Sequence, residues 1–288
     1  MTAHERISVN QVSSWDWTLD EDLERYPDLG IHTLGVHQRK LDDTGDAEAA
    51  AARVADAGMA ISTLLADNPL RLAEPDTWLD GAYELGRTLD LARALGAETV
   101  TIPTGDAGTL PWERAADALA DALRPTLAEA EREHLVVLLE PTNALRRDLG
   151  FVTSLRDAIE LGWRLGAGVC VELTTNWCER NLAGTITAGV DRIGLVHVSD
   201  LVIGTRCTPD RRVPGDGDLP LGRVVGQLLD AGYDGRFELE LRGPHIDEEG
   251  YASAIERSLA ALADLIEPPD DEDDDDADVP PDVDAADG

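Results

Sequence analysis

The sequence predicts an α/β protein, a (β/α)8 barrel followed by a disordered acidic tail. Three observations favour this class. Short apolar runs alternate with amphipathic stretches from Arg6 to Ile266. Eight pairs of one run and one stretch fit that length. The apolar runs are too hydrophobic for strands that keep one face in water. Such strands, separated by helices, are typical of a parallel sheet closed on itself. An open doubly wound sheet is the alternative, but no GxGxxG turn follows the first apolar run.

The eight predicted strands are short apolar runs of the kind that strands in a dry sheet require. In chain order they are 7–11, 33–37, 59–65, 99–103, 135–140, 168–173, 193–198 and 236–241.

The segments between these strands carry helix start and stop signals. Thr18 and Glu21 have the spacing of a capping box before the first helix. Glycines close four later helical patterns, because a glycine tolerates the left-handed conformation that ends a helix. They are Gly58, Gly96, Gly166 and Gly232.

The composition changes sharply at Glu267. From there to Gly288 the chain has twelve carboxylates, four prolines and no cation. Such a segment cannot bury enough apolar surface to order itself. We therefore predict a barrel domain at residues 1–266 and an acidic disordered tail at residues 267–288.

The charge balance excludes several classes of partner. The chain has 58 acidic and 24 basic residues, a net charge of −34, so phosphate backbones and anionic lipid surfaces would be repelled. We expect no nucleic-acid and no membrane partner. Lys40 is the only lysine, and carboxylates dominate the surface, a composition that favours a halophilic source in which salt screens the self-repulsion.

The cysteines and the hydropathy bear on the compartment. The three cysteines show no metal-type CxxC spacing, no secretory segment is recognised, and no apolar run reaches the roughly 20 residues that cross a bilayer. We expect a cytoplasmic protein, and the sequence is compatible with a homo-oligomer.

Four consecutive predicted strands end in metal-competent side chains. Glu140 ends LVVLLE, Glu172 lies in VCVELTTNW, His197 lies in LVHVSD and Glu240 lies in FELELRGP. These side chains are expected to converge, because the carboxyl ends of barrel strands meet at one face. Three carboxylates and one imidazole suit Mn²⁺ or Mg²⁺, and less strongly Zn²⁺ or Co²⁺. The alternative is four unrelated buried polar residues.

Glu238 lies two residues before Glu240 and therefore points to the same face of the last strand. It is either a neighbour that orients a ligand or a protonated inner carboxylate, and Glu240 is the preferred metal ligand.

Further polar residues near the strand ends are candidates for substrate binding. Asp200 lies three residues beyond His197 and could orient that ring, bind a substrate hydroxyl or cap a loop. His37 ends the second strand and could line the mouth. Lys40, as the sole lysine, has either a substrate-facing or a surface role, while a Schiff-base role would require burial.

Arginines crowd the loop after the seventh strand. Arg206, Arg211 and Arg212 could clamp a phosphate or carboxylate of a substrate, or could pair with the surrounding acids. Of these we take Arg206 as a substrate-binding candidate. Three tryptophans fall on mouth-side loops and could either pack against a sugar ring or belong to core or lid packing, namely Trp15, Trp17 and Trp177.

Four motifs together resemble the xylose isomerase-like TIM barrels of the sugar phosphate isomerase/epimerase superfamily. They are LEPTN, VHVSD, VPGDGDLP at 213–220 and AGYDGRFELEL, and the resemblance covers 6–266. It implies that Glu140, Glu172, His197 and Glu240 hold the metal and that Glu140 and Glu240 act as the acid–base pair.

The chain departs from this family at two positions. Glu172 stands where the family prefers Asp, and Thr175 stands where members often carry a substrate-binding His, so that Asn176 becomes the neighbouring candidate for substrate contact.

The resemblance implies a metal-dependent isomerase or epimerase of a small sugar or related polyhydroxy carbonyl compound, with proton transfer through a metal-bound enediolate. A dehydratase on the same scaffold and a catalytically silent barrel are the alternatives, the second because of Glu172 and Thr175. An endonuclease IV-like repair enzyme is disfavoured, since it needs a His-rich zinc site and a cationic groove, and the chain has six histidines and a charge of −34.

Overall fold

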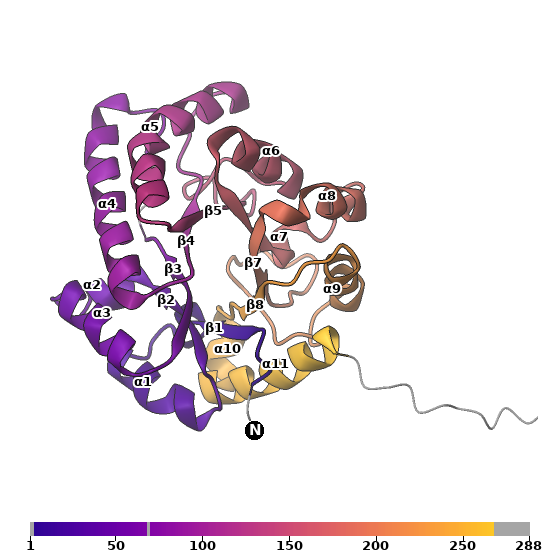
Figure 1. Ribbon diagram of the computed structural model, residues 1–288. Helices are drawn as coiled ribbons and strands as arrows, with labels where there is room; N and C mark the ends of the chain where they lie inside the picture. The colour runs from indigo at the N-terminus through magenta and orange to yellow at the C-terminus, as the bar shows by residue number, and fades with distance from the viewer. Residues whose placement is uncertain (1–2, 68–69, 268–288) are drawn as a thin grey trace, which may run out of the picture.

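Eight parallel strands pair in chain order, and the first pairs with the last, so the sheet closes into a barrel (Figure 1). This computed structural model describes residues 3–67 and 70–267. The strands are Ile7–Asn10 (β1), Thr33–His37 (β2), Ala60–Leu65 (β3), Thr99–Pro103 (β4), Val136–Glu140 (β5), Gly168–Glu172 (β6), Ile193–Val198 (β7) and Arg236–Leu239 (β8). Each lies within two residues of a predicted strand, so the predicted (β/α)8 barrel is confirmed.

Helices surround the strands on the outside of the barrel (Figure 1). They are Leu19–Asp28 (α1), Gln38–Asp42 (α2), Ala47–Asp56 (α3), Trp78–Leu95 (α4), Trp112–Arg132 (α5), Leu155–Leu165 (α6), Leu173–Asn176 (α7), Leu182–Gly189 (α8), Leu221–Asp230 (α9), Pro244–Glu249 (α10) and Tyr251–Ile266 (α11). Three 3-10 helices add Gln11–Ser14 (η1), Pro75–Thr77 (η2) and Val190–Arg192 (η3). The last helix, α11, returns to pack on β1.

The helix boundaries follow the predicted signals. Thr18 and Glu21 form both hydrogen bonds of the capping box at the start of α1. Gly96 and Gly166 end α4 and α6 in the left-handed conformation, with φ of 66° and 73°. A Cβ is disfavoured at this φ, so a glycine is the residue that ends these helices without strain.

Most strand residues are buried, as a barrel covered by helices requires. All residues of β1 and β2 are buried. Leu119 and Leu123 of α5 are also fully buried in the core between helices and strands.

Two further findings concern the ends of the fold. Within the part of the chain that the structure describes, no helix combines the length and apolar character needed to cross a membrane. The predicted acidic tail lies outside the described residues from residue 268 on.

Candidate metal centre at the barrel mouth

Four side chains from β5 to β8 meet at the carboxyl end of the barrel. Glu140 ends β5, Glu172 ends β6, His197 lies in β7 and Glu240 follows β8. Parallel pairing places them at one level, since Glu172 is in register with His197 and the Glu240 amide donates to Val198. One ligand atom from each lies within 4.8 Å of the others. The structure thus brings the four predicted residues together.

His197 lies at the centre of this cluster and is fully buried. Its Nδ1 is 3.0 Å from Oε1 of Glu140 and 3.5 Å from Oε2 of Glu240. Its Nε2 faces Oε1 of Glu238 at 3.3 Å, an ion-pair distance without a well-aligned hydrogen bond. A ring that carries its proton on Nε2 turns the Nδ1 lone pair toward the two mouth carboxylates.

Glu238 lies inside the barrel, below His197. Its carboxylate accepts hydrogen bonds from Ser8 at 2.8 Å, Asn10 at 2.7 Å and also Ser62. Gly35 leaves room for it, because a Cβ there would collide with the carboxylate. Burial raises the pKa of Glu238, but His197 and these donors lower it further, so that the net pKa is below its ordinary value. Glu238 therefore stays ionised and can orient the imidazole, the role of a carboxylate behind a metal-binding histidine.

Arg211 enters the cluster from the loop after β7 and is mostly buried. It binds Glu172 through two nitrogens, at 2.8 and 2.9 Å, and reaches Oε2 of Glu240 at 3.3 Å. It also donates to Thr174 and Ser199, at 2.6 and 2.9 Å. This two-pronged pairing fixes the orientation of Glu172.

The two carboxylates that contact Arg211 have opposite pKa shifts. Burial raises the pKa of Glu172, but the Arg211 guanidinium more than offsets this and holds the pKa well below its usual range. The pKa of Glu240 is raised to about 8, mainly by burial and further by the nearby charges of Glu172 and Glu140. Arg211 lowers this pKa too, but it is farther from Glu240 than from Glu172 and offsets less of the burial effect. Near neutral pH one mouth carboxyl group is thus ionised and another holds a proton.

The donor set fits a divalent cation. Among the described residues, the Glu140 side chain pairs only with His197, and both Glu140 and Glu240 face the Nδ1 atom. A carboxylate has about four lone-pair positions, so Glu172 can accept from Arg211 and still offer an oxygen to an ion. Oxygen ligands with one imidazole suit Mn²⁺, Mg²⁺ or Zn²⁺.

A cavity of about 340 Å³ opens above the cluster. Glu140, Glu172 and Glu240 line its floor, and Trp15 and His37 line its wall. The His37 ring packs edge-on against Trp15, and Nδ1 of His37 accepts from the Arg39 amide at the start of α2. Burial, reinforced by Arg242, lowers the pKa of His37 to about 3, so this ring is neutral.

Asp200 does not line the mouth cavity. It is buried, and its carboxylate accepts from the amides of Gly215, Gly217 and Leu219 at 3.0 to 3.1 Å and from Leu201 at 2.8 Å. Of the three predicted roles, the structure therefore favours the loop cap over orienting His197 or binding a substrate hydroxyl. Asp200 holds the 213–220 loop and, through it, the segment that carries Arg211.

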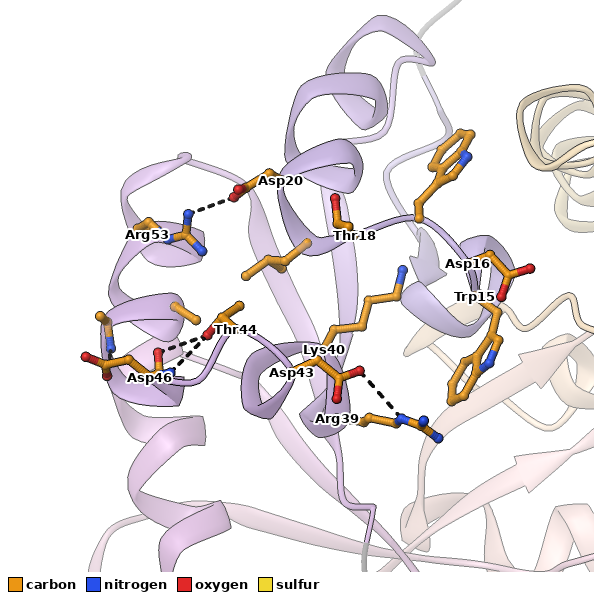
Figure 2. Close-up of a pocket in the computed structure, with 14 residues that line it drawn as sticks. Trp15, Asp16, Thr18, Asp20, Arg39, Lys40, Asp43, Thr44, Asp46 and Arg53 are labelled. Carbon is orange, nitrogen blue, oxygen red and sulfur yellow. Dashed lines mark hydrogen bonds and ion pairs between the residues drawn. The ribbon is translucent and has the colours of Figure 1, made fainter.

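Lys40 also lies outside the mouth cavity. Its ammonium is buried against Asp22 at 2.7 Å and the Ser14 carbonyl at 2.8 Å. Its side chain lines a larger cavity of about 750 Å³ beside α1, α2 and α3 (Figure 2). That cavity has none of the four clustered ligands, so we place the chemistry at the smaller one. Lys40 is an internal ion-pair partner of Asp22.

The last two predicted substrate-binding residues lie away from the mouth as well. Arg206 is exposed on the loop after β7 and does not line the cavity. Asn176 is fully buried, donates to Glu179 at 2.7 Å and accepts from the Glu172 amide at 3.3 Å. It supports the end of β6 from behind, and Thr175 is its neighbour that reaches the cavity.

Three cavity arginines are absent from the sequence prediction. Arg39, Arg146 and Arg242 follow β2, β5 and β8, respectively, and all line the mouth. Arg242 had a usable signal, because it lies two residues beyond Glu240, on the same face by the strand period. Arg39 and Arg146 had none, since the paths of their loops decide where they point.

Comparisons with known proteins place the chain in a family. A family profile described as "Xylose isomerase-like TIM barrel" matches residues 24–262. No protein of curated function matches the sequence.

Several solved structures share the fold over nearly their whole length. An IOLI protein with a bound zinc atom has 17% identity and a TM-score of 0.78, covering 91% of this chain and 98% of that one. Protein SMc04130 from Sinorhizobium meliloti has 18% identity and a TM-score of 0.76, with the same coverage. The 3-keto-D-glucoside 4-epimerase YcjR from E. coli has 19% identity and a TM-score of 0.69, covering 91% and 99%. With the barrel, the strand-end cluster and the profile match all in agreement, the chain belongs to the xylose isomerase-like TIM barrel family.

Proposed function

We propose that this protein is a divalent-metal-dependent isomerase or epimerase of a small polyhydroxy carbonyl compound. The observation that carries the proposal is the convergence of Glu140, Glu172, His197 and Glu240, within 4.8 Å, on the floor of a cavity. The zinc-bound IOLI structure and the epimerase among the similar folds support it.

The contacts of each side chain in the cluster indicate its role in the proposed reaction. A divalent ion held by the cluster would polarise a substrate carbonyl and acidify the neighbouring C–H bond. Glu140, which contacts His197, is the group we assign to accept that proton. Glu240 faces the same ring nitrogen at 3.5 Å and is the group we assign to return the proton. An acceptor and a donor at one site are what proton transfer between two carbon positions requires.

Solvent exchange tests this assignment directly. The protein, loaded with Mn²⁺ or Co²⁺ and freed of excess metal, is incubated in D2O with a panel of aldoses, ketoses and sugar acids, and proton NMR follows deuterium at the carbon beside the carbonyl. We expect metal-dependent exchange, and Glu240→Gln should slow it by about 100-fold or more. The same product spectra separate isomer, epimer and dehydrated product.

The matched control is Glu256→Gln, which makes the same change at an exposed site of α11. It should exchange like the unmodified protein. Absence of exchange with every metal and every compound, in a protein that melts cooperatively, contradicts the proposal.

A silent barrel is the second candidate, and the Arg211–Glu172 pair favours it. The guanidinium already neutralises part of the cluster charge, at 2.8 and 2.9 Å. If it substitutes for the ion, calorimetry will detect no binding of Mn²⁺, Co²⁺ or Zn²⁺ to the unmodified protein, whereas Arg211→Gln will bind one. The first candidate instead requires one bound ion with Arg211 in place.

A further inference from the structure

Cations gather at the mouth of the barrel although the chain as a whole is strongly acidic. Four arginines line the mouth cavity, namely Arg39, Arg146, Arg211 and Arg242. The chain has a net charge of −34, so an anion approaching most of its surface is repelled. The guanidinium groups at the cavity with the candidate metal ligands therefore allow an anionic ligand to bind there.

Arg242 is the arginine of this group that has no carboxylate partner among the described residues. Its guanidinium lies over the Trp15 ring, 3.5 Å from the ring centroid, and is half-buried. Among residues 3–67 and 70–267 it has no ion pair and no side-chain hydrogen bond. Carboxylates outnumber cations by 58 to 24 in this chain, so partners are abundant elsewhere. An arginine left without one, inside a cavity, presents its donors to a ligand.

The neighbours of Arg242 add positive charge. Arg39 lies by the same Trp15 ring, at 5.3 Å, and its nearest carboxylate is Asp43 at 3.6 Å (Figure 2). Arg146 lines the same cavity, where Asp148 pairs with it at 2.8 Å. These like charges repel one another, and a bound anion would relieve that repulsion.

The position of Arg242 along the barrel axis fixes which part of a ligand it meets. Glu238, Glu240 and Arg242 are spaced by two residues along β8 and its extension. Glu238 lies below His197, Glu240 at the metal-ligand level and Arg242 above it in the cavity wall. Two residues of extended chain span roughly 6 to 7 Å. An anionic group at Arg242 would thus lie a few carbon atoms from a carbonyl at the metal ligands.

Resting on the proposed function, we propose that the substrate is an acidic sugar, a polyhydroxy carbonyl compound whose far end carries a carboxylate or phosphate bound by Arg242 with Arg39 beside it. A neutral sugar would offer no charged partner to Arg242 and Arg39. Arg211 is not part of the anion site, because Glu172, Glu240, Thr174 and Ser199 already occupy its donors.

A trio of matched probes tests the proposal. D-glucose, D-glucuronate and D-glucose 6-phosphate share their first five carbons and differ only in the group at the sixth. Calorimetry measures their binding to the metal-loaded full chain at one fixed salt concentration. We expect at least one acid to bind about tenfold more tightly than glucose, as a charge-assisted arginine contact would give. The two acids distinguish a carboxylate site from a phosphate site.

Variants assign the preference to a residue. Arg242→Gln should reduce the preference to within about twofold, Arg242→Lys should keep part of it, and glucose binding should change little in either. Arg132→Gln removes the same charge from an exposed site at the end of α5 and should keep the full preference. Equal binding of all three probes, including no binding of any, overturns the proposal, as does a preference that survives Arg242→Gln.

This result is independent of turnover, so the two proposals can fail separately. A protein that prefers the acids but shows no metal-dependent deuterium exchange keeps its anion site and loses the proposed reaction. A protein that exchanges deuterium into neutral sugars, equally well with Arg242→Gln, keeps the reaction and loses the acidic substrate.

Discussion

Glu238 shows how one buried residue sets the chemistry of the residues above it. Its carboxylate is anchored by Ser8, Asn10 and Ser62 and faces Nε2 of His197. A proton held on Nε2 by this carboxylate would leave the Nδ1 lone pair to a bound cation.

Replacing this carboxylate should weaken metal binding without unfolding the barrel. Glu238→Gln keeps the shape, and the two serine hydroxyls can accept from the new amide as well as donate. We expect the Co²⁺ affinity to fall by about tenfold or more, measured from the visible absorption of bound Co²⁺. A far-UV melt checks the fold, and unchanged Co²⁺ affinity would show that Glu238 does not orient His197.

His37 gives a pH dependence of stability whose sign is fixed. Its folded-state pKa is about 3, below the 6.5 of an ordinary histidine, because the ring is buried and Arg242 is near. The unfolded chain therefore binds a proton that the folded chain does not, and stability is lost as pH falls below about 6.5. Between pH 6.5 and about 5 this loss is about 1–2 kcal/mol.

His37→Asn removes the titration and keeps an acceptor for the Arg39 amide. Urea unfolding at about pH 7.5 and pH 5 should show a smaller loss of free energy of unfolding for this variant than for the unmodified protein. Parallel losses in both would contradict a buried neutral His37.

The element that most directly shapes the site is the loop after β7. Asp200 gathers four amides of this loop, and the same loop carries Arg211 to Glu172. Gly217 lies so close that a Cβ there would collide with Asp200. Asp200, which lies outside the cavity, thus positions Arg211, which lines it.

Asp200→Ala should loosen this loop as a unit. We expect the amides of Gly215, Gly217 and Leu219 to lose protection in hydrogen exchange and the protein to lose about 2–3 kcal/mol of stability. Asp218→Ala is the matched control, since that exposed carboxylate accepts one bond, from Ile203. Unchanged exchange at Gly215 and Gly217 would show that the loop holds its shape without Asp200.

The sequence predicts elements well and loop residues poorly, for a physical reason. Strand bounds were recovered within two residues, because burial on both faces imposes an apolar run of fixed length. Glu140, Glu172, His197 and Glu240 were grouped because strand ends must converge. Asp200 and Asn176 instead turn away from the cavity, since a loop amide and the amide at the end of β6, respectively, compete for their oxygens. Neither strand periodicity nor helix periodicity carries that information.

At the scale of the whole molecule, we expect the net charge to determine how stability depends on salt. The chain carries −34, and such self-repulsion acts at every separation until salt shortens the screening length to about 3 Å at 1 M. We expect the melting temperature to rise by about 10 °C between about 0.1 and 1 M KCl, followed by differential scanning calorimetry. A flat melting temperature would contradict adaptation to high salt.

Closure of the sheet between β1 and β8 has a consequence during synthesis. The strand that completes the cylinder carries Glu238, the inner carboxylate. The residues that follow this strand are Glu240, a candidate metal ligand, and Arg242, the proposed anion contact. On the ribosome, a nascent chain that has emerged only through β7 has two open sheet edges and an incomplete centre. Closure of the cylinder and assembly of the candidate metal centre are therefore a single event, and we expect a chain that ends before β8 to lack the complete centre.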